Sequence, residues 1–211
     1  MEYDLPRDLK EAEDQQLESI LFGLKNTSSF RLSVYLKFEG LKLNPIIFRL
    51  FKSLLTSGYL PHIVFSDSGA SALAKRDFNI YQEQIHTFKE FTVNEAITDS
   101  NAIALMIAPQ PYDFDAFNSL VQSCKCKSIM INGRLEDTAV GIGSVGRDRR
   151  SSFISSWKTI YSIEPLSRAA LIYSPFTSWK LYSLSSDGYR YIDKFDVRPD
   201  DEIVQESLSK Q

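Results

Sequence analysis

The chain of 211 residues has only two cysteines and two histidines. Cys124 and Cys126 are one residue apart, a spacing at which a disulfide is geometrically awkward. The sequence has no Cys-x-x-Cys or His-x-x-x-His spacing of the kind found in zinc sites, and no Ser-His-Asp or Cys-His triad is evident. These scarcities favour a non-catalytic protein that uses no metal or cofactor and is kept in a reducing compartment.

Long apolar runs and excess positive charge are also missing. The longest apolar run, about residues 102–108, is far shorter than the roughly 18 residues that a membrane span needs. The formal net charge of −3 argues against nucleic acid as a partner. The acidic, polar N-terminal segment resembles neither a secretory signal nor a transit peptide. We therefore expect a cytoplasmic chain with no direct membrane span, which reaches a membrane only through a protein partner.

The pattern of apolar residues predicts a single α/β domain. Helical spacing alternates with short buried strands as far as residue 161, which is typical of a three-layer, Rossmann-like fold with a mainly parallel sheet. After Pro165 the pattern changes to three strands separated by turn signals, which predicts a C-terminal antiparallel meander. The expected segments are an N-terminal helix within residues 1–30, a βα core over 31–165, the meander over 166–199 and a C-terminal helix or tail over 200–211.

Two parts of the core are harder to interpret. Residues 79–101 are ambiguous, with Thr87–Val93 as a candidate strand. The last core helix follows a glycine-rich turn, and its apolar spacing predicts that Phe153, Trp157, Ile160 and Tyr161 all lie on its buried face.

That glycine-rich turn, Gly-x-Gly-x-x-Gly over residues 141–146, is the most site-like stretch of the chain. It leads into a helix start that carries Arg147, Arg149 and Arg150. Positive charge is disfavoured at a helix N-terminus, where the macrodipole is already positive. The arginines therefore need an anion, which is either a carboxylate such as Glu136, Asp137 or Asp67, or a bound phosphate or carboxylate.

The glycine spacing matches the dinucleotide-binding fingerprint as a string, but its context differs. Eight residues separate the preceding strand from the first glycine, and the unit is the last of the core rather than the first. We therefore expect no nicotinamide or flavin here. Anion capture by backbone amides and arginines, and a purely structural turn, both stay open.

Ligands of parallel α/β sheets bind beyond the carboxyl ends of the strands. The loop Ser66–Gly69 and the segment Asn132–Arg150 both follow buried strands, so they are expected to share one crevice. The alternative for the first loop is that Asp67 or Ser66 only caps the next helix. The candidate ligand-binding residues are Asp67, Ser68, Gly69, Asn132, Arg134, Gly141, Gly143, Gly146, Arg147 and Arg150.

Aromatic residues crowd the predicted meander. Trp179, Tyr182 and Tyr191 are the candidates for a partner-binding surface, because aromatic side chains dominate many interfaces. The alternative is that these rings fill the core of the meander itself.

Four groups of segments carry a resemblance to a known family. They are Phe38-Glu39-Gly40-Leu41 with Asn44-Pro45, residues 65–78, residues 132–137 with 141–143, and residues 157–161 leading into Pro165-Leu166. Over roughly residues 31–199 the chain resembles a domain-of-unknown-function family of cyanobacteria and chloroplasts. Members include the photosystem II assembly factor Low PSII Accumulation Three and extensions of some plastid adenylate kinases. The chain departs from the family where Ser66, Ser68 and Gly133 replace the usual Pro, Ala and Pro.

The resemblance implies a function but no catalytic residues. It implies a cyanobacterial accessory or assembly factor for photosystem II or another thylakoid complex, which acts from the cytoplasmic side. The expected partner is a photosystem II subunit or another assembly factor. Two alternatives stay open: a binder or enzyme of a phosphorylated or nucleotide ligand at Asn132–Arg150, and a purely structural module of a larger complex.

Overall fold

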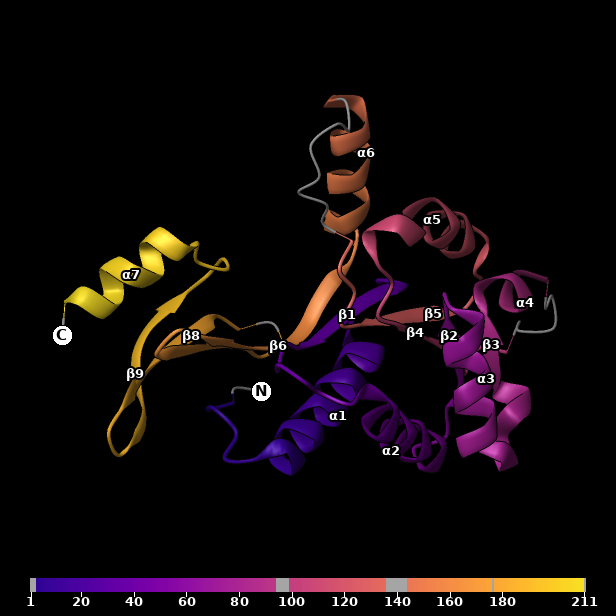
Figure 1. The fold of residues 1–211 in the computed structure, drawn as a ribbon, viewed down its shortest axis with the longest axis horizontal. Helices are drawn as coiled ribbons and strands as arrows, with labels where there is room; N and C mark the ends of the chain where they lie inside the picture. Colours follow the sequence, from indigo (N-terminus) through magenta and orange to yellow (C-terminus); the bar gives the residue numbers. More distant parts are fainter. Residues whose placement is uncertain (1–2, 94–98, 136–143, 176, 211) are drawn as a thin grey trace. The chain divides into compact units, whose positions relative to one another are not determined.

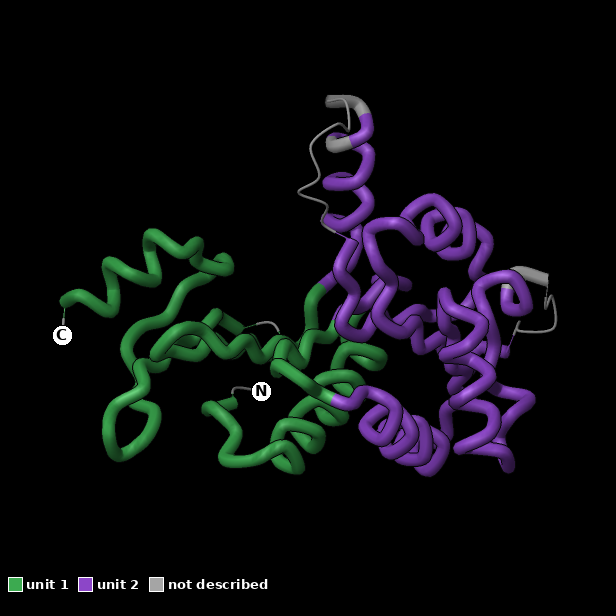
Figure 2. The backbone as a smooth tube through the Cα atoms, in the orientation of Figure 1, with its two compact units in different colours: residues 1–27, 34–41, 159–211 green, residues 28–33, 42–158 purple. Residues whose placement is uncertain are grey.

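The computed structural model describes residues 3–93, 99–135, 144–175 and 177–210. The chain separates into two compact units, coloured differently in Figure 2. The first unit comprises residues 1–27, 34–41 and 159–211, and the second comprises residues 28–33 and 42–158. The residues of the second unit are therefore inserted within the sequence of the first.

The second unit contains a parallel sheet. Its strands lie in the order β3-β2-β4-β5, and the start of β1 comes next to β5. All six residues of β4 are buried, as expected for a continuous apolar run that forms a central strand of the sheet. The bounds are β1 (Arg31–Leu36), β2 (Leu60–Phe65), β3 (Ile85–Thr87), β4 (Ala102–Ile107) and β5 (Lys127–Ile131).

The helices of the second unit cover both faces of this sheet. Helices α2 and α3 lie on one face and α4 and α5 on the other (Figure 1), as right-handed crossovers between parallel strands require. The predicted three-layer, mainly parallel architecture is therefore confirmed. The bounds are α2 (Leu43–Thr56), α3 (Ser68–Asp77), α4 (Phe88–Val93), α5 (Phe114–Ser123), α6 (Ser144–Ser155) and the 3₁₀ helices η1 (Asn79–Gln84) and η2 (Pro111–Asp113).

A cluster of aromatic rings joins α4, α5 and α6. Phe117 is fully buried and stacks on Trp157, with ring centroids 5.6 Å apart. The centroids of Phe88 and Phe153 lie 5.5 and 5.8 Å from that of Phe117. Phe153 and Trp157 are therefore core residues, but Trp157 lies beyond the end of α6 and not on its buried face, where the helical spacing placed it.

The first unit contains the antiparallel strands β6 (Lys158–Leu166), β7 (Ala169–Tyr173), β8 (Trp179–Ser185) and β9 (Gly188–Phe195). The end of β1 is next to β6, and the Lys37 backbone N–H donates to the Ile163 carbonyl at 3.0 Å. Helix α7 (Asp201–Ser209) packs Val204 and Leu208 against Leu171 and Leu181. Helix α1 (Leu9–Asn26) meets β6 through a buried hydrogen bond from the Tyr161 hydroxyl to Gln15. The predicted C-terminal meander is thus confirmed.

The segment Thr87–Val93 is not a strand. Thr87 ends β3 and α4 follows at once. The Glu90 carboxylate accepts from the Thr87 N–H at 2.7 Å, and the Glu90 N–H donates to the Thr87 hydroxyl at 3.2 Å. This is a capping box, and the Thr-x-x-Glu spacing that signals it is present in the sequence.

The prediction that Ile160 and Tyr161 continue the last core helix is also wrong. Helix α6 ends at Ser155, and both residues belong to β6. Alternating side chains in β6 point to opposite faces, so Tyr161 and Ile163 share one face while Ser162 and Glu164 share the other. The meander therefore has four strands instead of three.

Candidate functional site

The two loops predicted to share a crevice follow β2 and β5, two strands of the parallel sheet with β4 between them. Because β2, β4 and β5 are parallel, the loops that follow them meet at one edge of the sheet. The loop after β4 lies between the two predicted loops and is tied to the one after β5. The Ala108 N–H donates to the Ile131 carbonyl, and the Arg134 N–H donates to the Pro109 carbonyl, both at 2.8 Å.

Two residues at this edge adopt the left-handed backbone region without being glycine. Ala108, after β4, has φ +44°, and Asn132, after β5, has φ +52°. Asparagine tolerates this region and alanine rarely does, so Ala108 is the more strained position. At Gly133 a Cβ would meet the Met130 side chain, which would have to move to admit a larger residue. Arg134 is exposed beside them.

Asp67 caps a helix. Its carboxylate accepts from the Ala70 N–H at 2.6 Å, and its carbonyl accepts from the Ser71 N–H at 3.1 Å. Ser68 and Gly69 form the exposed first turn of α3. Capping was one of the two interpretations of Asp67 that the sequence left open, and the geometry supports it.

Replacing Asp67 with alanine is expected to lower the free energy of unfolding by about 1 kcal/mol, because α3 loses its N-cap acceptor. Asp67→Ser restores an acceptor oxygen and is expected to retain most of that stability. Urea unfolding followed by circular dichroism measures both. Equal stability of Asp67→Ala and wild type would show that the cap contributes nothing.

The glycine-rich turn falls largely outside the described residues. Gly141, Gly143, Glu136 and Asp137 all lie there, as does the side chain of Arg147. Helix α6 begins at Ser144, where the glycine pattern predicted a helix start, and Gly146 lies in its first turn.

The described arginines of α6 meet α5. The Arg149 guanidinium lies 3.3 Å from the Asp115 carboxylate, a partner that the sequence analysis did not consider. The guanidinium carbons of Arg149 and Arg150 lie 5.6 and 4.7 Å from the centre of the Phe114 ring. Such contacts are cation–π interactions. Asp115 lies in the first turn of α5, where its negative charge also complements the helix dipole.

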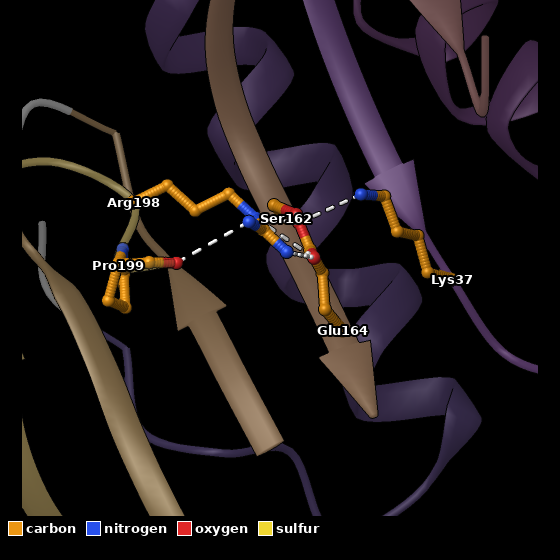
Figure 3. A network of polar contacts seen from close by, with 5 residues as sticks. All are labelled: Lys37, Ser162, Glu164, Arg198 and Pro199. Carbon is orange, nitrogen blue, oxygen red and sulfur yellow. Dashed lines mark hydrogen bonds and ion pairs between the residues drawn. The ribbon is translucent and has the colours of Figure 1, made fainter. Parts of the chain in front are cut away.

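A buried carboxylate that the sequence analysis missed lies in the first unit. Glu164 on β6 is only 4% exposed, and three side chains surround its oxygens (Figure 3). Arg198 donates to Oε2 from Nη2 at 2.8 Å and from Nε at 3.2 Å. Lys37 Nζ lies 3.1 Å from Oε1, and the Ser162 hydroxyl donates to the same atom at 3.1 Å.

The charges around Glu164 keep it ionised. Burial acts to raise the pKa of Glu164, but hydrogen bonds and positive charge from Arg198 and Lys37 outweigh it and hold the pKa below its ordinary value. A carboxylate bonded in this way is a poor acid or base. Its role is to fix the segment that leads into α7 against β6. A charged residue within an otherwise buried strand is the sequence signal for such a site.

The two histidines meet in the second unit. Nδ1 of His62 lies 3.0 Å from Nε2 of His86, because β2 and β3 pair in parallel. Burial and the neighbouring His62 lower the pKa of His86 to about 4, so both rings are neutral near pH 7. A shallow pocket of about 410 Å³ lies beside them, lined by Lys75, Gln82, Glu83, Ile85, His86 and Glu90.

The predicted partner-binding rings have different environments. Trp179 is buried in the cluster beneath α7, and Tyr182 is buried with its hydroxyl donating to Asp4 at 3.0 Å. Tyr191 packs edge-on against Tyr182 yet is 52% exposed. Leu184 and Tyr189 are paired in the β8–β9 register, on the same face as Tyr191, and both are exposed. We call Leu184, Tyr189 and Tyr191 the hairpin surface.

The described residues thus define an α/β protein that joins a parallel βα unit to an antiparallel meander. The chain belongs to the family described as a domain of unknown function (DUF1995), which matches residues 6–206. No curated protein matches the chain.

Two features are absent from the described residues. No helix among them combines the length and apolar character needed to cross a bilayer. Their His, Cys, Asp and Glu side chains include no group of three or more placed to hold a metal ion.

Proposed function

We propose that the protein is a non-catalytic accessory factor that binds another protein through the hairpin surface. The observation that carries this proposal is the exposure of Leu184, Tyr189 and Tyr191 on one face of the hairpin. Tyrosine is enriched at protein interfaces, where it offers a large apolar ring and a hydroxyl that can hydrogen-bond at the rim.

The backbone of the hairpin favours a protein partner too. Among the described residues, β9 is an edge strand of the sheet. The backbone groups on its outer side can therefore pair with an extended segment of another chain. A lipid surface is a weaker fit, because the net charge of −3 is repelled by anionic headgroups.

The finer proposal concerns the partner. We infer, from the sequence resemblance, that the partner is a photosystem II subunit or another assembly factor. The protein would then act at the cytoplasmic side of the thylakoid in a cyanobacterium. The exposed rings supply a means of attachment that needs no membrane span of the protein's own.

Replacing both Tyr189 and Tyr191 with serine is expected to weaken binding to isolated photosystem II complexes at least tenfold, since interface tyrosines often contribute more than about 1.4 kcal/mol. Tyr112→Ser is the matched control, because Tyr112 is 85% exposed but belongs to the second unit. Binding of fluorescently labelled protein is measured by titration, with photosystem I complexes as the comparison and circular dichroism to verify folding.

Three results would overturn the proposal. Equal affinity of the double variant and wild type would remove the hairpin surface from the interface. Equal affinity for both photosystems, or for neither, would remove photosystem II as the partner. Sedimentation with protein-free vesicles of thylakoid lipids at physiological salt would show direct lipid binding instead.

A phosphorylated or nucleotide ligand at Asn132–Arg150 is the second candidate. Its support is the left-handed backbone at Ala108 and Asn132, since such strain concentrates at binding sites. Thermal stabilisation by inorganic phosphate or ATP that is lost in Arg134→Ala would favour this function. No shift at millimolar ligand would exclude it.

A further inference from the structure

The two cysteines, which the sequence placed in an awkward spacing, are held side by side in the second unit. Cys124 follows α5 as its C-cap, and Cys126 precedes β5. Their sulfur atoms lie 3.4 Å apart, and the Ser128 hydroxyl lies 3.5 Å from the Cys124 sulfur. The turn between α5 and β5 therefore places the Cys126 thiol and the Ser128 hydroxyl next to the Cys124 sulfur.

The two thiols differ in accessibility. Cys124 is partly exposed, whereas Cys126 is buried. A dithiol that exchanges with a disulfide needs this asymmetry, with one thiol reachable by the substrate and a second within reach of the first.

The surroundings also favour the thiolate form of Cys124. A hydrogen bond from the Cys126 thiol lowers the pKa of Cys124, with a further contribution from Ser128, and the same interaction raises the pKa of Cys126. The C-terminal end of α5 acts in the opposite direction, because its dipole is negative. The Cys126 thiol and the Ser128 hydroxyl lie close to the Cys124 sulfur, and their effect on its pKa outweighs that of the helix dipole.

Two lysines are sequence neighbours of the cysteines. Lys125 is exposed between the cysteines, and Lys127 follows Cys126 at the start of β5. Positive charge at this point attracts a negatively charged substrate over distances of about 10 Å at moderate salt.

We propose that Cys124 and Cys126 form a redox-active dithiol that exchanges with anionic low-molecular-weight disulfides, the class that includes glutathione disulfide. Cys124 is the attacking thiol and Cys126 the resolving thiol. This activity is independent of partner binding through the hairpin surface, which lies in the other unit.

The exchange has two steps. The Cys124 thiolate attacks one sulfur of the disulfide, the substrate S–S bond breaks, and one substrate thiolate leaves. The Cys126 thiol then gives its proton to that leaving thiolate and attacks the Cys124 sulfur, which releases the second substrate thiolate to be protonated by water. The protein dithiol is oxidised to a disulfide, and one substrate disulfide is reduced to two thiols. To form the disulfide, the sulfurs must close from 3.4 Å to the covalent distance of about 2.05 Å.

The reduced full-length protein is incubated with glutathione disulfide, quenched with acid and weighed by mass spectrometry. Wild type is expected to lose two hydrogen atoms and to retain no glutathione. Cys126→Ser should trap one glutathione on Cys124, whereas Cys124→Ser should react at least tenfold more slowly because Cys126 is buried. Ser128→Ala should react several-fold more slowly than wild type at neutral pH.

The lysine contribution is tested by comparing two substrates. Lys125→Gln should slow the reaction with anionic glutathione disulfide but not with neutral hydroxyethyl disulfide. The ratio of the two rates cancels any change in thiolate fraction. A folded wild-type protein that stays reduced, or that accumulates a stable glutathione adduct, would overturn the proposal. So would equal rates for the two single cysteine variants.

Discussion

The variant Phe117→Ala is expected to lose about 3–5 kcal/mol of unfolding free energy, the range found when a buried phenylalanine is truncated. Phe117 is fully buried between α4 and the end of α6, where it touches the rings of Phe88, Phe153 and Trp157. Rings held by several elements cannot collapse easily into the cavity, so the cost should lie toward the upper part of that range.

Urea unfolding provides the measurement. The chain has two tryptophans, Trp157 in the second unit and Trp179 in the first, so single-tryptophan variants report on each unit separately. Tyr112→Ala, at an exposed ring, is the control and should change stability by less than about 0.5 kcal/mol. A loss below about 1 kcal/mol in Phe117→Ala would contradict the packing described for this cluster.

The second large effect is expected at the buried carboxylate. Arg198→Met should lower the free energy of unfolding by about 2 kcal/mol at pH 7, because Glu164 stays charged and buried with part of its compensation removed. We place the effect below the usual range for broken buried pairs because Arg198 is partly exposed and Lys37 and Ser162 still contact the carboxylate.

The same site predicts a pH dependence. The pKa of Glu164 is lower in the folded chain than its ordinary value of 4.5. Its stabilisation is therefore complete above pH 4.5 and is lost as the pH falls through the folded-state pKa. The stability difference between wild type and Glu164→Gln should thus shrink as the pH falls below 4.5.

Glu206→Gln, which removes an exposed pair with Lys210, is the control and should show little difference at any pH. If the Glu164→Gln difference were constant with pH, the ion network would not be formed in solution.

Local signals in the sequence were enough to predict the fold class. The apolar run at residues 102–108 predicted a central strand, and the turn residues after Pro165 predicted the meander. Where the prediction was wrong, a local signal was overlooked or misread. Thr87 and Glu90 form a capping box, and the spacing of Ile160 and Tyr161 fits either a helix or a strand in a short window.

The sites were harder to predict because they depend on contacts between distant residues. Glu164 and Arg198 are 34 residues apart, and His62 and His86 are 24 apart. Parallel pairing and the path of the chain bring them together, and no local pattern encodes either. The cysteines show the opposite case, since they are neighbours in sequence but only the geometry of the α5–β5 turn directs both sulfurs to the same side.

The division of β1 between the two units has a consequence for synthesis on the ribosome. All residues of the second unit lie at or before residue 158, so they have all been made before β6–β9 follow, and domains generally fold as units during synthesis. Helix α1 and the end of β1 are made before β6–β9, which complete the unit to which they belong. Helix α1 is therefore made before the second unit but completes its packing only after that unit has been made.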